Sequence, residues 1–300
     1  MSESMEILRR KISSAEDLGS VVRTMKALAA ASIVQYERAV HSLADYYHAI
    51  ELGLYACVRA TAGIQRVKES WRLAVQPTIR AIIFGSDQGL VGKFNDQLAV
   101  FAAAELRKSP GQKTVLAIGE RIRGRMQDVG FSVGCTYAVP NSVIGITPLV
   151  SQILVDQESE DQRGETYVFH NRPAGTQSYE PIKHRLLPLD TTWQAAFGQM
   201  QWPTKLLPEV LGPAELTLAA LIHEYLFVSL FKACAESLAS ENTCRLAAMQ
   251  RAQRNIDDLL EQLHMVFNQT RQTSIDEELF DVISGFEALA GGEVGVRSER

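Results

Sequence analysis

The ten prolines of this 300-residue chain all lie between Pro77 and Pro213, and none lies in residues 1–76 or 214–300. A proline inside a helix costs roughly 3 kcal/mol, because it lacks the amide hydrogen and its ring clashes with the preceding turn. Two long proline-free arms therefore flank a proline-rich middle segment. This distribution predicts two coiled-coil helix regions, 1–76 and 214–300, around a central domain at 77–213, with a frayed Gly-rich tail from Ala290 to Arg300.

Both arms carry apolar residues at the alternating steps of three and four that a coiled-coil seam requires. The first arm has this spacing at Leu8, Ile12, Ala15, Val22, Met25 and Ala29, and again at Tyr36, Val40, Leu43, Tyr47, Ile50 and Leu54. The second arm has it at Met249, Ala252, Ile256, Leu259, Leu263, Val266 and Thr270. A helix of about 50 residues is roughly 75 Å long, so it needs a partner along its length. We expect the two arms to pair as an antiparallel coiled coil.

The middle segment alternates runs typical of strands with helical patterns of about a dozen residues. The expected strands are 79–84, 114–118, 131–139, 166–170 and 182–187, and the expected helices are 94–107, 120–129 and 147–158. Such alternation indicates βαβ units and a mostly parallel sheet. The predicted fold class is α/β, with an antiparallel two-helix coiled coil from the N- and C-terminal helices flanking a central Rossmann-like, mostly parallel α/β domain.

One stretch of this domain, IRAIIFGSDQGLVGKFN at Ile79–Asn95, looks like a phosphate loop because a β-branched run ends in three glycines, Gly85, Gly89 and Gly92. The dinucleotide motif needs its first two glycines two residues apart, and here they are four apart. The Walker A motif needs Ser or Thr after Gly-Lys, and here Phe94 follows Lys93. We therefore interpret the stretch as a tight strand-to-helix turn and expect no bound cofactor.

The composition limits the possible functions further. A net charge of -5 argues against a general nucleic-acid binder, since neutralising phosphates needs a surplus of Lys and Arg. The charged N-terminus has no signal-peptide pattern, and no uninterrupted apolar run is long enough to span a membrane. The four cysteines and six histidines show no metal-ligand spacing, so we expect no metal site.

Candidate chemical groups are few. Ser86 lacks the glycine pattern of a nucleophile elbow, and His170 and His184 lie on expected strands, where a structural role is the simpler interpretation. The arginines of the second arm, Arg245, Arg251, Arg254 and Arg271, are surface charges on one interpretation. On the other they contact acidic groups of a partner protein.

Three segments together resemble a known family. The loop Ser86–Asn95 is similar to the family pattern Ser-Asp-Arg-Gly-Leu-Cys-Gly-Gly-Phe-Asn. The segment Ser240–Asn242 with Arg245 and Met249, and the segment Asn268–Ile275 with Glu278 and Leu279, resemble its C-terminal signature. In the first arm, Met25 precedes an Ala-Ala-Ser run. These features resemble the gamma subunit of rotary F-type ATP synthases over nearly the whole chain.

The chain also departs from the family pattern. Gln88, Val91 and Lys93 replace the usual Arg, Cys and Gly of the loop. We therefore expect a divergent member of the family, with an alternative F-type ATPase as a possible host complex.

The resemblance implies a function without bond chemistry in this chain. It implies a central shaft inside a ring of alpha and beta subunits, with the α/β domain touching the epsilon subunit and the membrane c-ring, the latter between Leu187 and Pro213. Its implied location is the cytoplasmic face of the bacterial inner membrane. The catch loops of a catalytic subunit would contact Arg271, Gln272, Arg245 and Met25. An upper apolar sleeve would surround Leu279, Val282, Ile283 and Phe286.

Two alternatives stay open from the residues alone. The first is a flavodoxin-like nucleotide-binding α/β enzyme with helical dimerisation arms. The second is an adaptor protein whose coiled coil associates with itself. Saturable nucleotide binding would favour the first, and dimerisation without a partner would favour the second.

Overall fold

The computed structural model describes residues 2–60, 78–158, 164–175, 178–187, 202 and 208–293. Its two longest helices are α1, Ser2–Ala60, and α7, Ala214–Glu293. The chain forms two compact units, one made of Met1–Lys26 with Met249–Arg300 and the other of Ala27–Ala248. Each long helix therefore contributes to both units, which are described in turn.

The larger unit contains a five-stranded sheet with the order β3-β2-β1-β4-β5. Its strands are β1 Thr78–Phe84, β2 Gln112–Ile118, β3 Val133–Tyr137, β4 Gly164–Pro173 and β5 Tyr179–Leu187. The strand β1 pairs in parallel with β2 and β4, β2 pairs in parallel with β3, and β5 runs antiparallel to β4. The expected α/β class with a mostly parallel sheet is confirmed.

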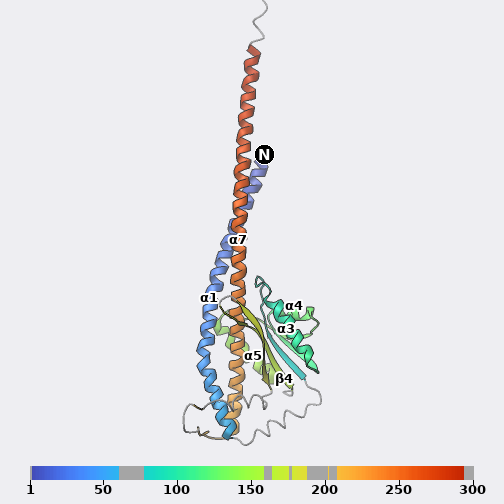
Figure 1. Cartoon of the computed structure of the whole chain (residues 1–300), viewed down its shortest axis with the longest axis vertical. Coiled ribbons are helices and arrows are strands. Elements are labelled where there is room, and N and C mark those ends of the chain that lie inside the picture. The colour runs from blue at the N-terminus through green and yellow to red at the C-terminus, as the bar shows by residue number, and fades with distance from the viewer. Residues whose placement is uncertain are drawn as a thin grey trace, which may run out of the picture. The chain divides into compact units, whose positions relative to one another are not determined.

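Helices cover both faces of the sheet (Figure 1). On one face lie α3, Phe94–Lys108, and α4, Glu120–Asp128. Their buried side chains, including Leu98 and Met126, pack against Ile79, Ala81 and Ile83 of β1. The run Ile79–Phe84 is buried throughout, as expected for a central strand covered on both sides.

The opposite face is covered by α5, Ile146–Glu158, preceded by the short 3-10 helix η1, Val143–Gly145, and by the two long helices. Its core joins Ile82 and Phe84 of β1 to Ile153 of α5, Tyr36 of α1 and Leu238 of α7. The first part of the C-terminal arm therefore completes the hydrophobic core of the α/β domain, in agreement with its apolar sequence.

Beyond the sheet, α1 and α7 of the larger unit pack directly on each other. Ile50 and Leu54 form a buried cluster with Tyr225 and Val228. The rings of Tyr47 and Tyr225 lie 5.8 Å apart. The side chains predicted for this part of the seam thus do face a helix partner.

The smaller unit is an antiparallel pair of helix segments. The guanidinium of Arg9 lies 5.6 Å from the ring centroid of Phe267, and a Cβ on Gly19 would lie 3.5 Å from Ile256. Residue numbers therefore rise along one helix while they fall along the other, as predicted. Gly19 is itself a buried seam position between Ala15 and Val22, so the predicted stripe continues through it.

The predicted seam of α7 is wrong at two positions. Leu259 and Val266 are 46% and 48% exposed, whereas their neighbours Leu260 and Phe267 are more buried. Both choices keep the three-four spacing, and both pairs are apolar, so the sequence pattern alone did not define the phase. The frayed tail is also corrected in part, because α7 continues through Glu293; residues 294–300 lie outside the described part of the chain.

Candidate functional site

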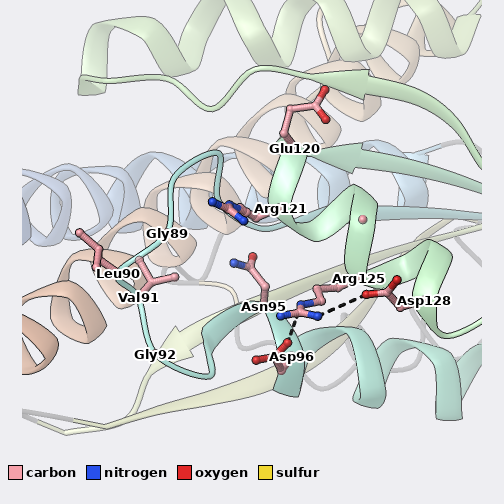
Figure 2. A pocket seen from close by; sticks show the side chains of 11 residues that line it. Gly89, Leu90, Val91, Gly92, Asn95, Asp96, Glu120, Arg121, Arg125 and Asp128 are labelled. Carbon is pink, nitrogen blue, oxygen red and sulfur yellow. Dashed lines mark hydrogen bonds and ion pairs between the residues drawn. The ribbon is translucent and has the colours of Figure 1, made fainter.

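The Gly-rich loop lines a surface cavity of about 400 Å³ (Figure 2). The loop Gly89–Gly92 forms one side, and side chains from α3 and α4 form the other. Among its lining residues are two arginines and three carboxylates, so the formal charge of the cavity wall is -1. This is a poor environment for a nucleotide phosphate, which needs a surplus of positive charge or free amide donors.

One of the two arginines is already neutralised. Arg125 Nε lies 2.7 Å from an oxygen of Asp96, and Arg125 Nη1 lies 3.3 Å from an oxygen of Asp128, as Figure 2 shows. The other, Arg121, has no ion pair with any described residue. A single exposed guanidinium does not make a phosphate cradle, so the cavity supports the interpretation of a structural turn.

The polar residues of the loop are used in holding its own shape. Asn95 Nδ2 donates to Ser86 Oγ at 2.8 Å, and the backbone N–H of Ser86 donates to Asn95 Oδ1 at 3.0 Å. Ser86 and Asn95 are both buried. This reciprocal pair ties the end of β1 to the start of α3, and it explains why the motif has Ser and Asn nine residues apart.

Asp87 fixes the loop to two further elements. One carboxylate oxygen accepts from the backbone N–H of Glu120, at 2.9 Å, in the first turn of α4. The other accepts from the backbone N–H of Val139, at 2.7 Å, just after β3. The N-terminus of α4 is a natural anion site through its free amides and dipole. Here the chain's own carboxylate already satisfies it.

Two glycines of the site are required by close approach. A Cβ on Gly85 would lie 2.2 Å from Cβ of Ile122, and one on Gly119 would lie 2.6 Å from the carbonyl oxygen of Ser86. Leu90, by contrast, has a φ of +64° without being glycine, and its side chain is 60% exposed. The loop tip therefore holds an apolar side chain in a strained conformation, away from any core.

The crevice in which doubly wound folds bind dinucleotides is occupied by α7. That crevice lies at the carboxyl ends of the strands where the strand order reverses, here between β1 and β4. Ser237 Oγ donates to the carbonyl of Phe84 at 2.9 Å, and Ser240 Oγ donates to the carbonyl of Asn171 at 3.0 Å. A helix bonded to both strand ends lies where such a fold would hold its cofactor, which argues against the flavodoxin-like alternative.

The residues expected to contact catch loops have different environments. Arg271 and Gln272 are exposed on α7 in the smaller unit, and Met25 is half-buried. Arg245 belongs to the larger unit and is paired: its guanidinium bonds Glu241, and Nη1 donates to Asn242 Oδ1 at 3.1 Å. Its side chain retains 14% exposure, so contact with a partner would first have to compete with Glu241.

The predicted apolar end is exposed on all four side chains: Leu279 56%, Val282 69%, Ile283 47% and Phe286 77%. Within the smaller unit, a cavity is lined by Met5, Glu6 and Arg9 of α1 and by Ser274, Glu277, Glu278 and Asp281 of α7. Since α1 begins at Ser2, α7 beyond this level has no helix partner among the described residues. Such a long exposed apolar helix end is typical of an interaction surface.

Sequence reasoning missed two buried acidic residues of the larger unit, Glu236 and Glu241. His170 Nε2 lies 2.8 Å from Glu236 Oε2, with both side chains nearly inaccessible. Glu241 is 5% exposed, and burial raises the pKa of its carboxyl despite the guanidinium of Arg245. The available signal was an acidic residue within the apolar part of the second arm, where every third or fourth position faces the core.

No group of three or more potential metal ligands occurs among the residues that the structure describes. One described helix, α7, contains an 18-residue window apolar enough to cross a membrane, and half of that window is buried inside the protein. Core helices of soluble proteins meet the same criterion, so this is weak evidence for a membrane span.

Comparisons with known proteins agree with this architecture. A family model described as ATP synthase matches residues 4–289. The ATP synthase gamma chain of Desulforamulus reducens is 26% identical over 94% of this chain and 98% of its own length. That of Herminiimonas arsenicoxydans is 26% identical over 96% of this chain and 100% of its own length.

A solved structure shares the fold. A chain of the Euglena gracilis mitochondrial ATP synthase, in a structure of its OSCP, F1 and c-ring, is similar with a TM-score of 0.64 and 17% identity over 100% of this chain and 99% of that chain. The protein therefore belongs to the ATP synthase family. Within it, the chain is a gamma subunit of the rotary enzyme, as the loop and the C-terminal signature indicated.

Proposed function

We propose that this gamma subunit acts as the rotating shaft of its complex. It couples ion flow through a membrane c-ring to ATP synthesis or hydrolysis at catalytic beta subunits. The observation that carries the proposal is the projecting end of α7, an exposed apolar helix continuing beyond the antiparallel pair. A long, asymmetric helix pair can differ in its contacts with each surrounding subunit, and rotation then moves those differences from site to site.

The chain contributes no catalytic group to this function. Ser86, Asp87 and Asn95 of the Gly-rich loop are committed to internal hydrogen bonds. The crevice at the strand ends is occupied by Ser237 and Ser240 of α7. These observations support a subunit that binds no cofactor and leaves nucleotide chemistry to its neighbours.

We assign the catch-loop contacts to Arg271 and Gln272, with Met25 and Arg245 as further candidates. Arg271 and Gln272 are exposed, and neither has an internal hydrogen bond or ion pair with a described residue. An arginine in this state can form charge-assisted bonds with a partner's carboxylates without first breaking an internal pair. Arg245 can do so only by exchanging Glu241 for a partner group.

The apolar end suits a different partner chemistry. Leu279, Val282, Ile283 and Phe286 are exposed apolar side chains, which suit a hydrophobic sleeve formed by the alpha and beta subunits, while the carboxylates between them, such as Asp281, face solvent or polar groups. A helix end that rotates inside such a sleeve should form few directional hydrogen bonds with it. These four side chains have no hydrogen-bonding groups.

The opposite end of the shaft would meet the c-ring and the epsilon subunit. Most of the segment expected at the c-ring, Leu187–Pro213, lies outside the described residues, so this contact rests on the resemblance alone. Attachment to a c-ring would make the chain peripheral to a membrane, on the cytoplasmic face of the bacterial inner membrane. Its divergence from curated gamma chains is consistent with an alternative F-type ATPase.

Recovery of the tagged chain from detergent-solubilised host membranes tests the proposal. Alpha-type and beta-type ATPase subunits with ATPase activity should be recovered with it. Clean isolation of the chain without them would refute the shaft function.

The contact assignment is tested by the double variant Arg271→Ala/Gln272→Ala. Coupled ATP turnover should fall about tenfold, the scale of losing one buried arginine contact. The helical content of the chain should not change. A matched control, Arg251→Ala/Gln262→Ala, alters the same residue types at exposed positions of the same helix and should leave turnover near wild type. Equal effects of the two double variants would remove the assignment.

A further inference from the structure

The face of α7 that lies on the sheet is built largely from small apolar side chains. Ala233, Cys234, Ala235 and Ala239 are all buried in the core that it shares with β1, α1 and α5. Small side chains form shallow ridges, and apolar packing of about the right volume tolerates alternative arrangements. Only Leu230 and Leu238 are larger among the buried α7 side chains of this core, so apolar packing specifies the rotation and axial position of α7 less strictly than directional bonds do.

Three buried polar side chains lie on the same part of the helix. Glu236, Ser237 and Ser240 are 8%, 3% and 0% exposed. Residues three and four apart share one face of a helix, so Ser240 lies beside the other two. Each of the three is bonded to the sheet and not to the helix backbone.

The sheet partners come from two neighbouring strands. Ser237 donates to the carbonyl of Phe84 at the end of β1, and Ser240 donates to the carbonyl of Asn171 in β4. The carboxylate of Glu236 is hydrogen-bonded to His170 Nε2 at 2.8 Å, next to Asn171 in β4. The three bonds therefore attach one turn of α7 to both strands of the crevice.

These bonds distinguish one position of α7 from all others. A slip by one residue moves a helix about 1.5 Å and rotates it about 100°, which takes both hydroxyls out of reach of their carbonyls. It also separates Glu236 from His170 and leaves charged or polar groups buried without partners, a state that carries a large desolvation penalty. Buried polar residues fix helix register in coiled coils by the same physics.

We propose that Glu236, Ser237 and Ser240 form a polar register, which fixes α7 on the sheet and limits slip between the α/β domain and the shaft during coupled turnover. The proposal rests on the proposed shaft function. The three residues are positioning residues, because they touch neither nucleotide nor ion.

The first test replaces the buried hydrogen-bonded pair by apolar side chains, in the double variant His170→Phe/Glu236→Leu. A cavity of about 160 Å³ borders both residues and gives room for the larger ring. Replacing both partners of a buried hydrogen bond by apolar groups of similar shape is often nearly neutral or stabilising, so assembly and thermal stability should be retained. In reconstituted vesicles, the rate of ATP hydrolysis that is not coupled to ion pumping should nevertheless rise about fivefold. This factor corresponds to about 1 kcal/mol, the net contribution of one hydrogen bond.

The second test is Ser237→Ala/Ser240→Ala, which removes only two oxygen atoms and should likewise raise uncoupled hydrolysis. Its matched control is Thr243→Ala, because the Thr243 hydroxyl bonds only the helix carbonyl of Ala239. This control should stay coupled. Glu236→Gln keeps an oxygen that can accept a hydrogen bond from His170 and should stay coupled as well.

Each outcome decides. The polar register would be overturned if both double variants formed complexes with wild-type coupling. It would also be overturned if Thr243→Ala uncoupled hydrolysis as strongly as the double variants do. Should His170→Phe/Glu236→Leu fail to assemble, the serine variant decides alone. Failure of the wild-type complex to pump ions on ATP addition would count against the shaft function and not against the register.

Discussion

Asp87 offers the sharpest test of the structural interpretation of the Gly-rich loop. Its two carboxylate oxygens accept from the backbone N–H groups of Glu120 and Val139. A hydrogen bond to a charged group contributes about 1.5–3 kcal/mol. The bond to Glu120 lies near solvent and counts at the lower end, because water replaces it in part. The expected loss in Asp87→Ala is therefore about 3 kcal/mol of unfolding free energy.

Thermal unfolding of the purified chain, followed by circular dichroism, measures this loss. For a unit of about 200 residues, 1 kcal/mol shifts the midpoint by about 2–4 °C. Asp87→Ala should therefore unfold about 6–12 °C below wild type. Asp87→Asn should lie in between, because a carboxamide has one acceptor oxygen and presents a donor to the second amide.

The control is Asp128→Ala, which removes a carboxylate from the same cavity. Asp128 is 66% exposed and, among the described residues, pairs with Arg125 alone, so its loss should cost about 0.5 kcal/mol or less. An Asp87→Ala midpoint within about 2 °C of wild type would refute the reasoning. It would mean that the two bonds of Asp87 do not hold the loop in place.

Four further predictions concern single residues. Burial raises the pKa of Glu241 from its ordinary value of 4.5, so the folded chain holds this proton more tightly than the unfolded chain, and ionisation destabilises the fold as pH rises. Glu241→Gln should accordingly unfold at a higher temperature than wild type at pH 8, with the difference vanishing near pH 4 in calorimetry. Gly85→Ala should lose about 3 kcal/mol or more, since its Cβ would lie 2.2 Å from Ile122. Gly124→Ala, with nothing within 4 Å of its Cβ, should gain about 0.5–1 kcal/mol in denaturant titration. Gly19→Ala should stabilise the coiled coil by a similar amount, about 1 kcal/mol, because its Cβ makes ordinary contact with Ile256. A loss of helicity in that variant would contradict the seam position of Gly19.

The sequence predicted the elements well, because proline placement and periodicity are direct consequences of backbone geometry. Every described strand overlaps an expected one, and β1 differs by one residue at its start. The phase of the α7 seam was not predictable, since Leu259 and Leu260 are equally apolar and only the partner helix decides between them. The same ambiguity applied to Val266 and Phe267.

The site was predictable in kind and less so in detail. The missing Walker A hydroxyl pointed to a structural turn, but no sequence pattern indicated that Asp87 bonds the N-terminal turn of α4. The bond from His170 to Glu236 joins residues 66 positions apart, and no local pattern predicts such a pair. For the same reason the internal partner of Arg245, four residues earlier on one helix, was easier to foresee than that of Glu236.

The placement of α7 in the crevice of the sheet has a consequence for how the molecule is made. The core that joins Tyr36, β1 and Leu238 brings together residues about two hundred positions apart, and such long-range closure is slow. During synthesis from the N-terminus, the sheet emerges before the helix that seals one of its faces. One apolar face of the nascent α/β domain therefore stays exposed to solvent until α7 has left the ribosome. During this interval chaperones or other chains can bind the exposed face. The core of the α/β domain therefore closes only when α7 packs on the sheet. A truncated chain that lacks α7 cannot complete this core and should not assemble into a complex.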